Sequence, residues 1–529
     1  MPVLARVTVA VALLTSCASA SFQPHLANGA RPSTQPLGRD LCSAPRDSDN
    51  EKPPLELFHE PRGGGCEVQS HVTIGGVTQP IDSPLTVAHH NGTVVVVWVV
   101  CPERLERYDY EAGCPSYPTF WAELSGVSFV APVVVSVGMW ARGRVYRVAW
   151  RSHDAGPHEL SVRHWGDSAY FKGRSTCGKK RAPPGRPGKH VAGSPARLTF
   201  IKSNEFDDGR PLPLCGQNEL LNARARWLRD SGRDSGVFAP RSLSSGPFEY
   251  AWTPVGCRLR DFAPHALIDE LLGPQSGTLN LHFLGDSTIY YLCLALAGAL
   301  SNHTQEHLHS KFSRQAKIEG VRKVLQTEFA VGKARLHCYS TIRATHPRGQ
   351  AEVLREIVVA RQSPNSASRK SIFVVGDCGA YSACPTDGAS RDARGRDDFA
   401  SRRATATDGT RELILQAGRA VDGGYASSVV WIAPAFTRKS YMQRVRRMHG
   451  DQLALWRHAL SEHAGSSLFA VDQRPMSRYM HPRFAFDGLH YHSVSKRSSD
   501  GAEVFYGGPV LFTSLRLMFN ALLNHRRST

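Results

Sequence analysis

The sequence predicts two folded domains, an immunoglobulin-like β-sandwich followed by an α/β domain built on a parallel sheet. Three observations predict this class. The chain has 529 residues, 41% of them hydrophobic, and is too long for one typical domain. Residues 66–170 contain short runs rich in β-branched and aromatic residues, separated by turn residues. From about residue 205, strand-like runs alternate with helix-like runs.

The first twenty residues have the order of a cleaved signal peptide. Arg6 precedes a short apolar run, and Ala18-Ser19-Ala20 forms a small-x-small cleavage site. We therefore assign 1–20 to a signal peptide and expect a mature chain in the secretory pathway, either secreted or in the Golgi lumen. Later apolar stretches are of strand length or are broken by Pro132, so we expect no transmembrane segment.

Composition changes mark the next boundaries. Residues 21–65 are rich in Pro, Gly and charge, which predicts an irregular leader. In 66–170, runs such as GTVVVVWVV and GRVYRVAWRS indicate the strands of the sandwich. Residues 171–204 include KGRSTCGKKRAPPGRPGKH, whose prolines, glycines and basic residues predict a flexible linker.

The remaining residues, 205–529, have the alternation of an α/β domain. Buried strands are indicated by TLNLHFLG, SIFVVGD, SSVVWIAPA and SLFAVDQ. TIYYLCLALAGALSNH has the length and apolar character of a buried helix, and YMQRVRRMHGDQLALWRHALSEHAG is amphipathic. Such alternation predicts a parallel sheet covered by helices on both faces.

The formal charge of +18 limits the chemical classes of binding partner that we expect. A basic surface is compatible with nucleic acid, an acidic glycan or an anionic membrane. No nucleic-acid-binding motif accompanies the charge, and secretion argues against such a partner. We therefore expect no nucleic acid, and an acidic acceptor stays compatible with the charge.

The cysteines are expected to form disulfides in an oxidising lumen. Without Cys17, eleven of the twelve cysteines are left, so one is free or pairs with another chain. Local pairs are plausible although spacing leaves connectivity open: Cys101 with Cys114, Cys215 with Cys257, and Cys378 with Cys384. Sequons at Asn91 and Asn302 also fit a lumenal protein.

Gly285-Asp286-Ser287 lies where a predicted buried strand meets a predicted helix. Serine is a weak nucleophile unless a base takes its proton. Backbone amides that open a helix can stabilise an oxyanion. The same three residue types at 166–168 follow a strand with no helix after it, so we do not expect Ser168 to be catalytic. The predicted strand before Ser287 and the predicted helix after it, more than the Gly-Asp-Ser triplet itself, make Ser287 the candidate nucleophile.

The partner residues are expected near the C-terminus, in FAFDGLHYHSV. Asp487 and His490 form D-x-x-H in a loop after the last predicted strand. One loop could thus bring a base and its orienting acid to Ser287. His492 lies close by, so the choice of histidine is open.

A rival motif follows the predicted nucleophile helix. HTQEH, residues 303–307, matches the H-x-x-E-H pattern of zinc proteases. It overlaps the Asn302 sequon, where a glycan would crowd a metal. We expect a polar helix end here, with no metal and no cofactor.

Several motifs together resemble a known family. FLGDST, FDGLHYH and a lead-in with Trp and Cys residues make 205–525 similar to the PC-esterase branch of the SGNH (GDSL-like) superfamily. The lead-in residues are Cys215, Trp227, Trp252, Pro254 and Cys257. With the sandwich in front, the whole chain resembles the neurexophilin and PC-esterase domain (NXPE-like) proteins.

The resemblance implies a flavodoxin-like three-layer fold and an acyl-enzyme mechanism on sugar hydroxyls. Ser287 would be acylated, His490 would act as general base and acid, and Asp487 would orient His490. Two departures stand out: Ile289-Tyr290-Tyr291 follows the serine, and no asparagine corresponds to the usual oxyanion donor. Backbone amides are the candidate donors instead, at Ser287, Gly376 and Gly379.

The sequence therefore predicts an SGNH-type O-acyltransferase or esterase acting on hydroxyls of a glycan or glycoprotein, with acetyl the expected acyl group. The resemblance favours transfer over hydrolysis, and the acyl donor is not specified. The alternative is a catalytically silent secreted glycan-binding or adhesion protein that retains the fold.

Overall fold

The computed structural model is described over 55–74, 77–80, 85–89, 94–105, 107–109, 114–116, 118–130, 132–140, 143–151, 154–167, 188–202, 212–222, 225–229, 250–254, 256–262, 264–273, 277–301, 325–340, 346–360, 369–376, 399–433, 442–462, 467–478, 493–495, 504–506 and 508–528. The signal peptide, both sequons and HTQEH lie outside these ranges. No helix within them is both long and apolar enough to cross a membrane.

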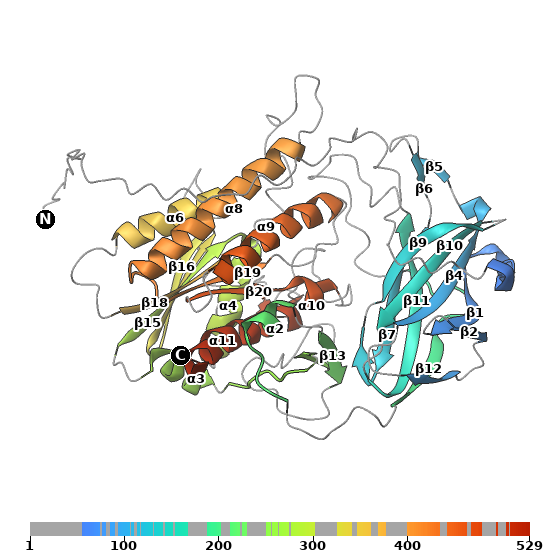
Figure 1. Cartoon of the computed structure of the whole chain (residues 1–529), viewed down its shortest axis with the longest axis horizontal. Helices are drawn as coiled ribbons and strands as arrows, with labels where there is room; N and C mark the ends of the chain where they lie inside the picture. The colour runs from blue at the N-terminus through green and yellow to red at the C-terminus, as the bar shows by residue number, and fades with distance from the viewer. Residues whose placement is uncertain are drawn as a thin grey trace, which may run out of the picture. The chain divides into compact units, whose positions relative to one another are not determined.

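The N-terminal region consists of two β-sheets (Figure 1). One sheet has the order β2-β1-β4-β10-β9, with β1 (Glu67–Ile74), β2 (Val77–Pro80), β4 (Val94–Pro102), β9 (Val133–Trp140) and β10 (Gly143–Arg151). The other has the order β3-β12-β11-β7, with β3 (Leu85–His89), β7 (Pro118–Gly126), β11 (Gly156–Asp167) and β12 (Ala196–Lys202). All neighbours are antiparallel except β12 and β3.

The two sheets share one apolar core. Rings from opposite sheets meet edge to face, Phe120 with Tyr146 at 4.8 Å between centroids and Trp150 with Phe200 at 6.4 Å. Edge-to-face contact is a favoured geometry for aromatic pairs, so these ring pairs stabilise the packing of one sheet against the other. The region is therefore a β-sandwich.

Strand β4 explains why GTVVVVWVV is apolar without alternation. Val95, Val97 and Val99 point into the core between the sheets. Trp98 points to the opposite face, where it contacts Phe58 with 5.8 Å between ring centroids. Because Phe58 is buried there, the end of the segment predicted to be an irregular leader belongs to the sandwich.

The predicted linker boundary is also wrong. Residues 188–202 form part of the sandwich, and β12 pairs with both β11 and β3. The amide of Val191 donates to the carbonyl of Val162, and Leu198 and Phe200 are buried in the core. These two apolar side chains alternate with polar ones, which is the pattern of a half-buried strand.

Cys101 forms a disulfide with Cys66, so the predicted Cys101–Cys114 pair is wrong. Antiparallel strands β1 and β4 pair Glu67 with Val100, which brings Cys66, directly before Glu67, opposite Cys101, directly after Val100. The Cα atoms of Cys66 and Cys101 are 4.1 Å apart. Register between strands, which sequence spacing does not report, decides this pairing.

The C-terminal region is a mixed α/β domain with a mostly parallel sheet, as predicted. Its six strands have the order β16-β17-β15-β18-β19-β20. Their bounds are β15 (Thr278–Gly285), β16 (Leu325–Val331), β17 (Ala334–Ser340), β18 (Arg369–Gly376), β19 (Ser428–Ala433) and β20 (Leu468–Asp472). Only β16 runs antiparallel to its neighbour. Numbered along the chain, the five parallel strands have the order 2-1-3-4-5.

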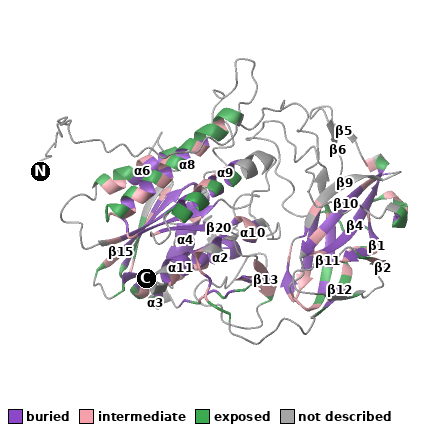
Figure 2. Ribbon diagram, viewed as in Figure 1, coloured by how far each residue is buried: buried purple, intermediate pink, exposed green. Residues whose placement is uncertain are grey.

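Helices cover both faces of this sheet (Figure 1). One face carries α3 (Pro264–Leu272), α4 (Ser287–Ser301) and α11 (Pro509–Ser528). The other carries α6 (Pro347–Ala360), α8 (Phe399–Asp422) and α9 (Met442–Glu462). In β18, Ile372 and Val374 face the first layer, whereas Phe373 and Val375 face the second. Strands β15, β18, β19 and β20 are therefore buried along nearly their whole length (Figure 2), whereas β16 and β17 carry exposed residues such as Glu328 and Arg335.

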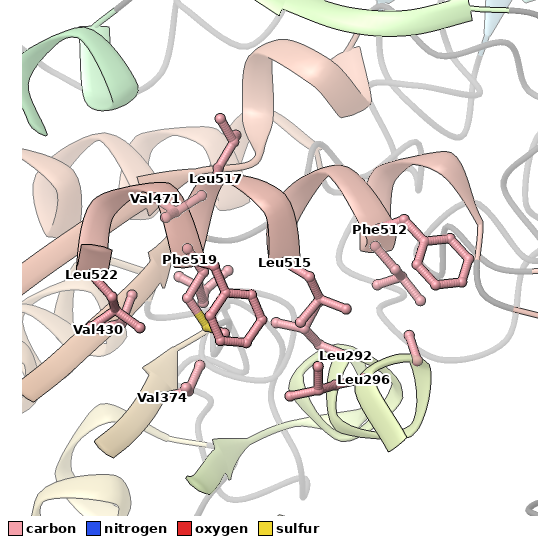
Figure 3. Packing of buried hydrophobic residues seen from close by; sticks show 14 of the residues in the cluster. Leu292, Leu296, Val374, Val430, Val471, Phe512, Leu515, Leu517, Phe519 and Leu522 are labelled. Atoms are coloured by element: carbon pink, nitrogen blue, oxygen red, sulfur yellow. The ribbon is translucent and has the colours of Figure 1, made fainter. Parts of the chain in front are cut away.

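The layer formed by α4 and α11 is the larger core. Leu515 of α11 lies beside Leu292 of α4 in Figure 3, and both are fully buried. The short helix α2 (Gln217–Asn222) packs against α11 and β20. This layer fixes α4, and hence the start of that helix, against the sheet.

The lead-in residues fold onto the same domain. The predicted disulfide between Cys215 and Cys257 forms, and both cysteines are buried. Strands β13 (Ala225–Arg229) and β14 (Tyr250–Pro254) pair with each other, and β13 also pairs with β8 (Ser128–Phe129). Trp227 and Trp252 meet edge to face in this small sheet.

Candidate active site

The turn from β15 into α4 positions Ser287 as the first residue of the helix. Asp286 precedes it and is fully buried. Oδ1 of Asp286 accepts a hydrogen bond of 2.8 Å from the amide of Thr288, and its carbonyl accepts one from Tyr290. Asp286 is therefore the N-cap of α4, a role in which carboxylates satisfy exposed amides and offset the helix dipole.

The residues after Ser287 are packing residues. Ile289 and Tyr290 are buried in the core beneath α4. A Cβ atom at Gly285 would lie 2.4 Å from Cγ1 of Ile289. Only glycine fits there, because the helix turns back directly over the end of β15. Ile289 and Tyr290 therefore pack α4 into the core directly after Ser287.

The end of β18 lies beside this turn. Gly376 is the register partner of Gly285. Gly376 has φ of +144°, and a Cβ atom on it would lie 2.2 Å from the carbonyl oxygen of Ile432. Both strands therefore end in glycine, and the two backbones approach each other with no side chain between them.

The first turn of α6 reaches the same point, and we did not predict this from the sequence. Nε2 of Gln350, which is fully buried, donates a hydrogen bond of 3.1 Å to the carbonyl oxygen of Gly376. The amide of Gln350 donates to the carbonyl of His346. Burial lowers the pKa of His346. Pro347, which follows this histidine, is a sequence signal for the first position of a helix.

A buried polar side chain also lies at the end of β20. Asp472 is buried and accepts two side-chain hydrogen bonds from Arg474, of 2.8 and 2.6 Å. His449 of α9 is also buried, and its pKa is lowered to about 3 by burial and, secondly, by the charge of Arg474. His449 is therefore neutral near pH 7 and too weak a base to activate a serine.

A buried disulfide joins α4 to the neighbouring strand and was also not predicted. Cys293 of α4 and Cys338 of β17 are bonded, with both side chains fully buried. The two cysteines lie 45 residues apart, in a helix and in a strand, and no motif in the sequence linked them. It anchors the helix that begins with Ser287 to the sheet.

The other predicted site residues lie outside the described part of the chain. These are Asp487, His490, Gly379, Cys378 and Cys384, together with the alternative base His492. The structure brings the start of α4 and Gly376 together. The Ser-His-Asp triad stays a prediction.

An open groove of about 640 Å³ lies between α8 and α9. Two ion pairs line it, Arg403 with Asp451 and Arg411 with Asp408. Its lining contains no serine, cysteine or histidine, so we assign it no chemistry. Across the described ranges, no three His, Cys, Asp or Glu side chains gather as metal ligands would.

Comparison with known proteins identifies no family. No protein-family model matches the chain, and no curated protein matches it.

Proposed function

We propose that this protein is a secretory-pathway O-acyltransferase or esterase of the SGNH type, acting on hydroxyls of a glycan or glycoprotein. One observation carries the proposal: Ser287 begins the helix that follows β15, next to a second strand that ends in glycine. Nucleophilic serines need an exposed turn and nearby amide donors.

The strand order supports the proposed fold. The order 2-1-3-4-5 is that of flavodoxin-like sheets, which bind ligands where the order reverses. That point lies between β15 and β18. The chain after β15 continues into α4 on one face, and the next described helix after β18, α8, covers the other face. Ser287 follows β15 on one side of this reversal of strand order, and Gly376 ends β18 on the other.

The proposed chemistry uses the predicted triad. His490 removes the proton from the Ser287 hydroxyl, which attacks the acyl carbonyl. Amides at Ser287, Gly376 and Gly379 stabilise the oxyanion, and His490 returns its proton to the leaving group. A sugar hydroxyl or water then attacks the acyl-enzyme, giving transfer or hydrolysis. Asp487 orients His490 throughout.

The other regions fit this setting. Three disulfides among the described residues are typical of an oxidising compartment. We assign the sandwich to the immunoglobulin-like class because it has two largely antiparallel sheets around one core. Its disulfide joins two strands of one sheet. The sandwich would then bind the acceptor or support the catalytic domain.

A serine-directed fluorophosphonate tests the enzyme proposal. We expect a mass increase on the peptide that contains Ser287 and none in Ser287→Ala. Ser168→Ala, which alters the other Gly-Asp-Ser sequence, is the matched control and should be labelled like the wild type. Wild-type protein that stays unlabelled at high reagent concentration would overturn the proposal. Acylated oligosaccharide formed from an acyl donor then identifies transfer, whereas free acid alone identifies hydrolysis.

The second candidate is a catalytically silent glycan-binding protein. The observation that favours it is the absence of an asparagine for the oxyanion site, together with the packing role of Ile289 and Tyr290. Glycan binding by a protein whose Ser287 resists the fluorophosphonate would establish this alternative.

A further inference from the structure

A short strand next to the sandwich belongs to the core of the α/β domain. Strand β8 pairs with β13, with Phe129 opposite Trp227. Phe129 is buried in the α/β core, where its ring centroid lies 5.6 Å from that of Tyr250. The next residue, Val130, packs against the core of the sandwich. We call β8, β13 and His158, which bonds to β8, the joint.

His158 of β11 holds β8 on the side away from β13. The carbonyl of Val127 accepts a hydrogen bond from the amide of Arg229 in β13, so the Ser128 N–H, which is trans to that carbonyl, points the other way. There Nε2 of His158 accepts a hydrogen bond of 3.2 Å from the Ser128 amide and lies 3.0 Å from the Ser128 hydroxyl oxygen. Nδ1 lies 3.1 Å from the carbonyl oxygen of Gly156.

These partners fix the protonation state of the His158 ring. A backbone N–H only donates, so Nε2 carries no proton, and a carbonyl oxygen only accepts, so Nδ1 carries one. The imidazole is therefore neutral in the closed joint. If Nε2 gains a proton, the Ser128 hydroxyl can rotate and accept from it, whereas the Ser128 amide faces a second N–H and loses its acceptor.

The inner face of the sandwich around His158 is apolar. The His158 ring lies edge to face with Phe200, with 5.2 Å between centroids, and both side chains are buried. Glu159 and Arg163 of the same strand lie on the opposite face of the sheet. The inner face carries Leu124 of β7, Leu160 and Val162 of β11, Leu198 and Phe200 of β12, and Trp150 of β10 across the core.

Strand β13 adds two positive charges to the joint. Nε of Arg226 bonds to both carboxylate oxygens of Asp154 at 2.7 Å, and the guanidinium of Arg229 lies 5.9 Å from the ring centroid of Tyr250. Asp154 balances one of the two arginines, so the net charge of these three groups is positive. A proton on His158 therefore removes a buried hydrogen bond and buries a further positive charge.

We propose that His158 makes the joint acid-sensitive: protonation of its imidazole displaces the Ser128 amide, and β8 then separates from β13. An exposed histidine takes up a proton near pH 6.5, so the open joint binds a proton more readily than the closed joint. The joint therefore stays closed above about pH 6.5 and opens increasingly below it. Phe129 leaves the α/β core when β8 is released. This inference is independent of any chemistry at Ser287.

Hydrogen–deuterium exchange of the full chain measures the release. Protection factors, which remove the intrinsic effect of pH on exchange, are compared between about pH 7.5 and about pH 5. We expect protection of 126–130 and 225–229 to fall about 10- to 30-fold relative to β15, the upper value being that of a histidine protonated only in the open joint. The comparison with β15 separates opening of the joint from acid destabilisation of the whole domain.

Three variants assign the effect. His158→Gln offers an amide oxygen that accepts at either pH, so its joint should keep the same relative protection at both. His164→Gln, which changes an exposed histidine on the same strand, is the matched control and should behave like the wild type. Ser128→Ala keeps the amide and removes the hydroxyl, so its joint should open in acid at least as much as that of the wild type.

A wild-type joint with equal relative protection at the two pH values would overturn the inference. Wild-type pH dependence in folded His158→Gln would also overturn it, because another group would then cause the opening. If His158→Gln does not fold, Ser128→Ala decides: loss of the pH dependence in that variant would show that the amide is not the group displaced.

Discussion

The buried carboxylate of Asp286 accepts a 2.8 Å hydrogen bond from the amide of Thr288. This bond fixes the first turn of α4, and Ser287 lies between the two residues that form it. The middle residue of the Gly-Asp-Ser motif therefore has a structural role that is independent of any chemistry at the serine.

Replacing Asp286 should weaken the start of α4. We expect Asp286→Ala to lower the free energy of unfolding by about 1–2 kcal/mol, because the cap acceptor is lost. Asp286→Asn should cost less, since its carbonyl oxygen can accept the same bond. Urea unfolding followed by circular dichroism measures both. Equal losses in the two variants would contradict the capping role.

Removing the Cys293–Cys338 disulfide should affect both stability and the site. We expect Cys293→Ala/Cys338→Ala to lose about 2–4 kcal/mol, as is usual for buried disulfides, and to be labelled more slowly at Ser287. Cys66→Ala/Cys101→Ala removes the disulfide of the sandwich instead. That control should lose stability while its labelling rate per folded site is unchanged. Similar labelling rates for the two double variants would show that the α4 disulfide does not position the helix.

His449 should make the protein less stable in acid. Its pKa is about 3 in the folded state and 6.5 as a free side chain, so the unfolded chain binds its proton first. Its contribution to stability is complete above about pH 6.5 and falls as the pH is lowered toward 3, by about 1.4 kcal/mol per unit. Denaturant unfolding across this range measures the slope.

The variant His449→Gln should reduce this acid slope relative to the wild type. His458→Gln, on the exposed side of the same helix, should leave the slope unchanged. If both variants keep the wild-type slope, groups other than His449 cause the acid sensitivity.

Gly376 should tolerate no side chain. In Gly376→Ala the new methyl group would lie 2.2 Å from the Ile432 carbonyl oxygen, in a backbone conformation that L residues rarely adopt. We expect a loss of about 3 kcal/mol or more in thermal unfolding experiments, combining backbone strain with overpacking. Gly332→Ala is the matched control, because Gly332 also has positive φ but no atom within 4 Å of its Cβ position. Its loss should be about 1–2 kcal/mol, from the left-handed backbone alone, and losses of equal size would refute the close approach.

The sequence alone determined the features that depend on neighbours along the chain. Alternating apolar runs predicted a parallel sheet with helices on both faces, and the junction at 285–287 was found as a strand that leads directly into a helix. The disulfide between Cys215 and Cys257 was also a correct prediction. The first two patterns are local, whereas Cys215 and Cys257 lie 42 residues apart within the same lead-in segment.

Only the tertiary structure decided which distant segments meet. It set the strand order 2-1-3-4-5, placed Gly376 beside Gly285, and brought Gln350 to the end of β18. It also replaced the expected Cys101–Cys114 bond and moved 188–202 from the linker into the sandwich. Strand order and register depend on which apolar faces can be buried together, and residues far apart in the chain determine that jointly. The periodicity of one segment does not indicate which distant segment it will pack against, so these contacts could not be predicted from local patterns.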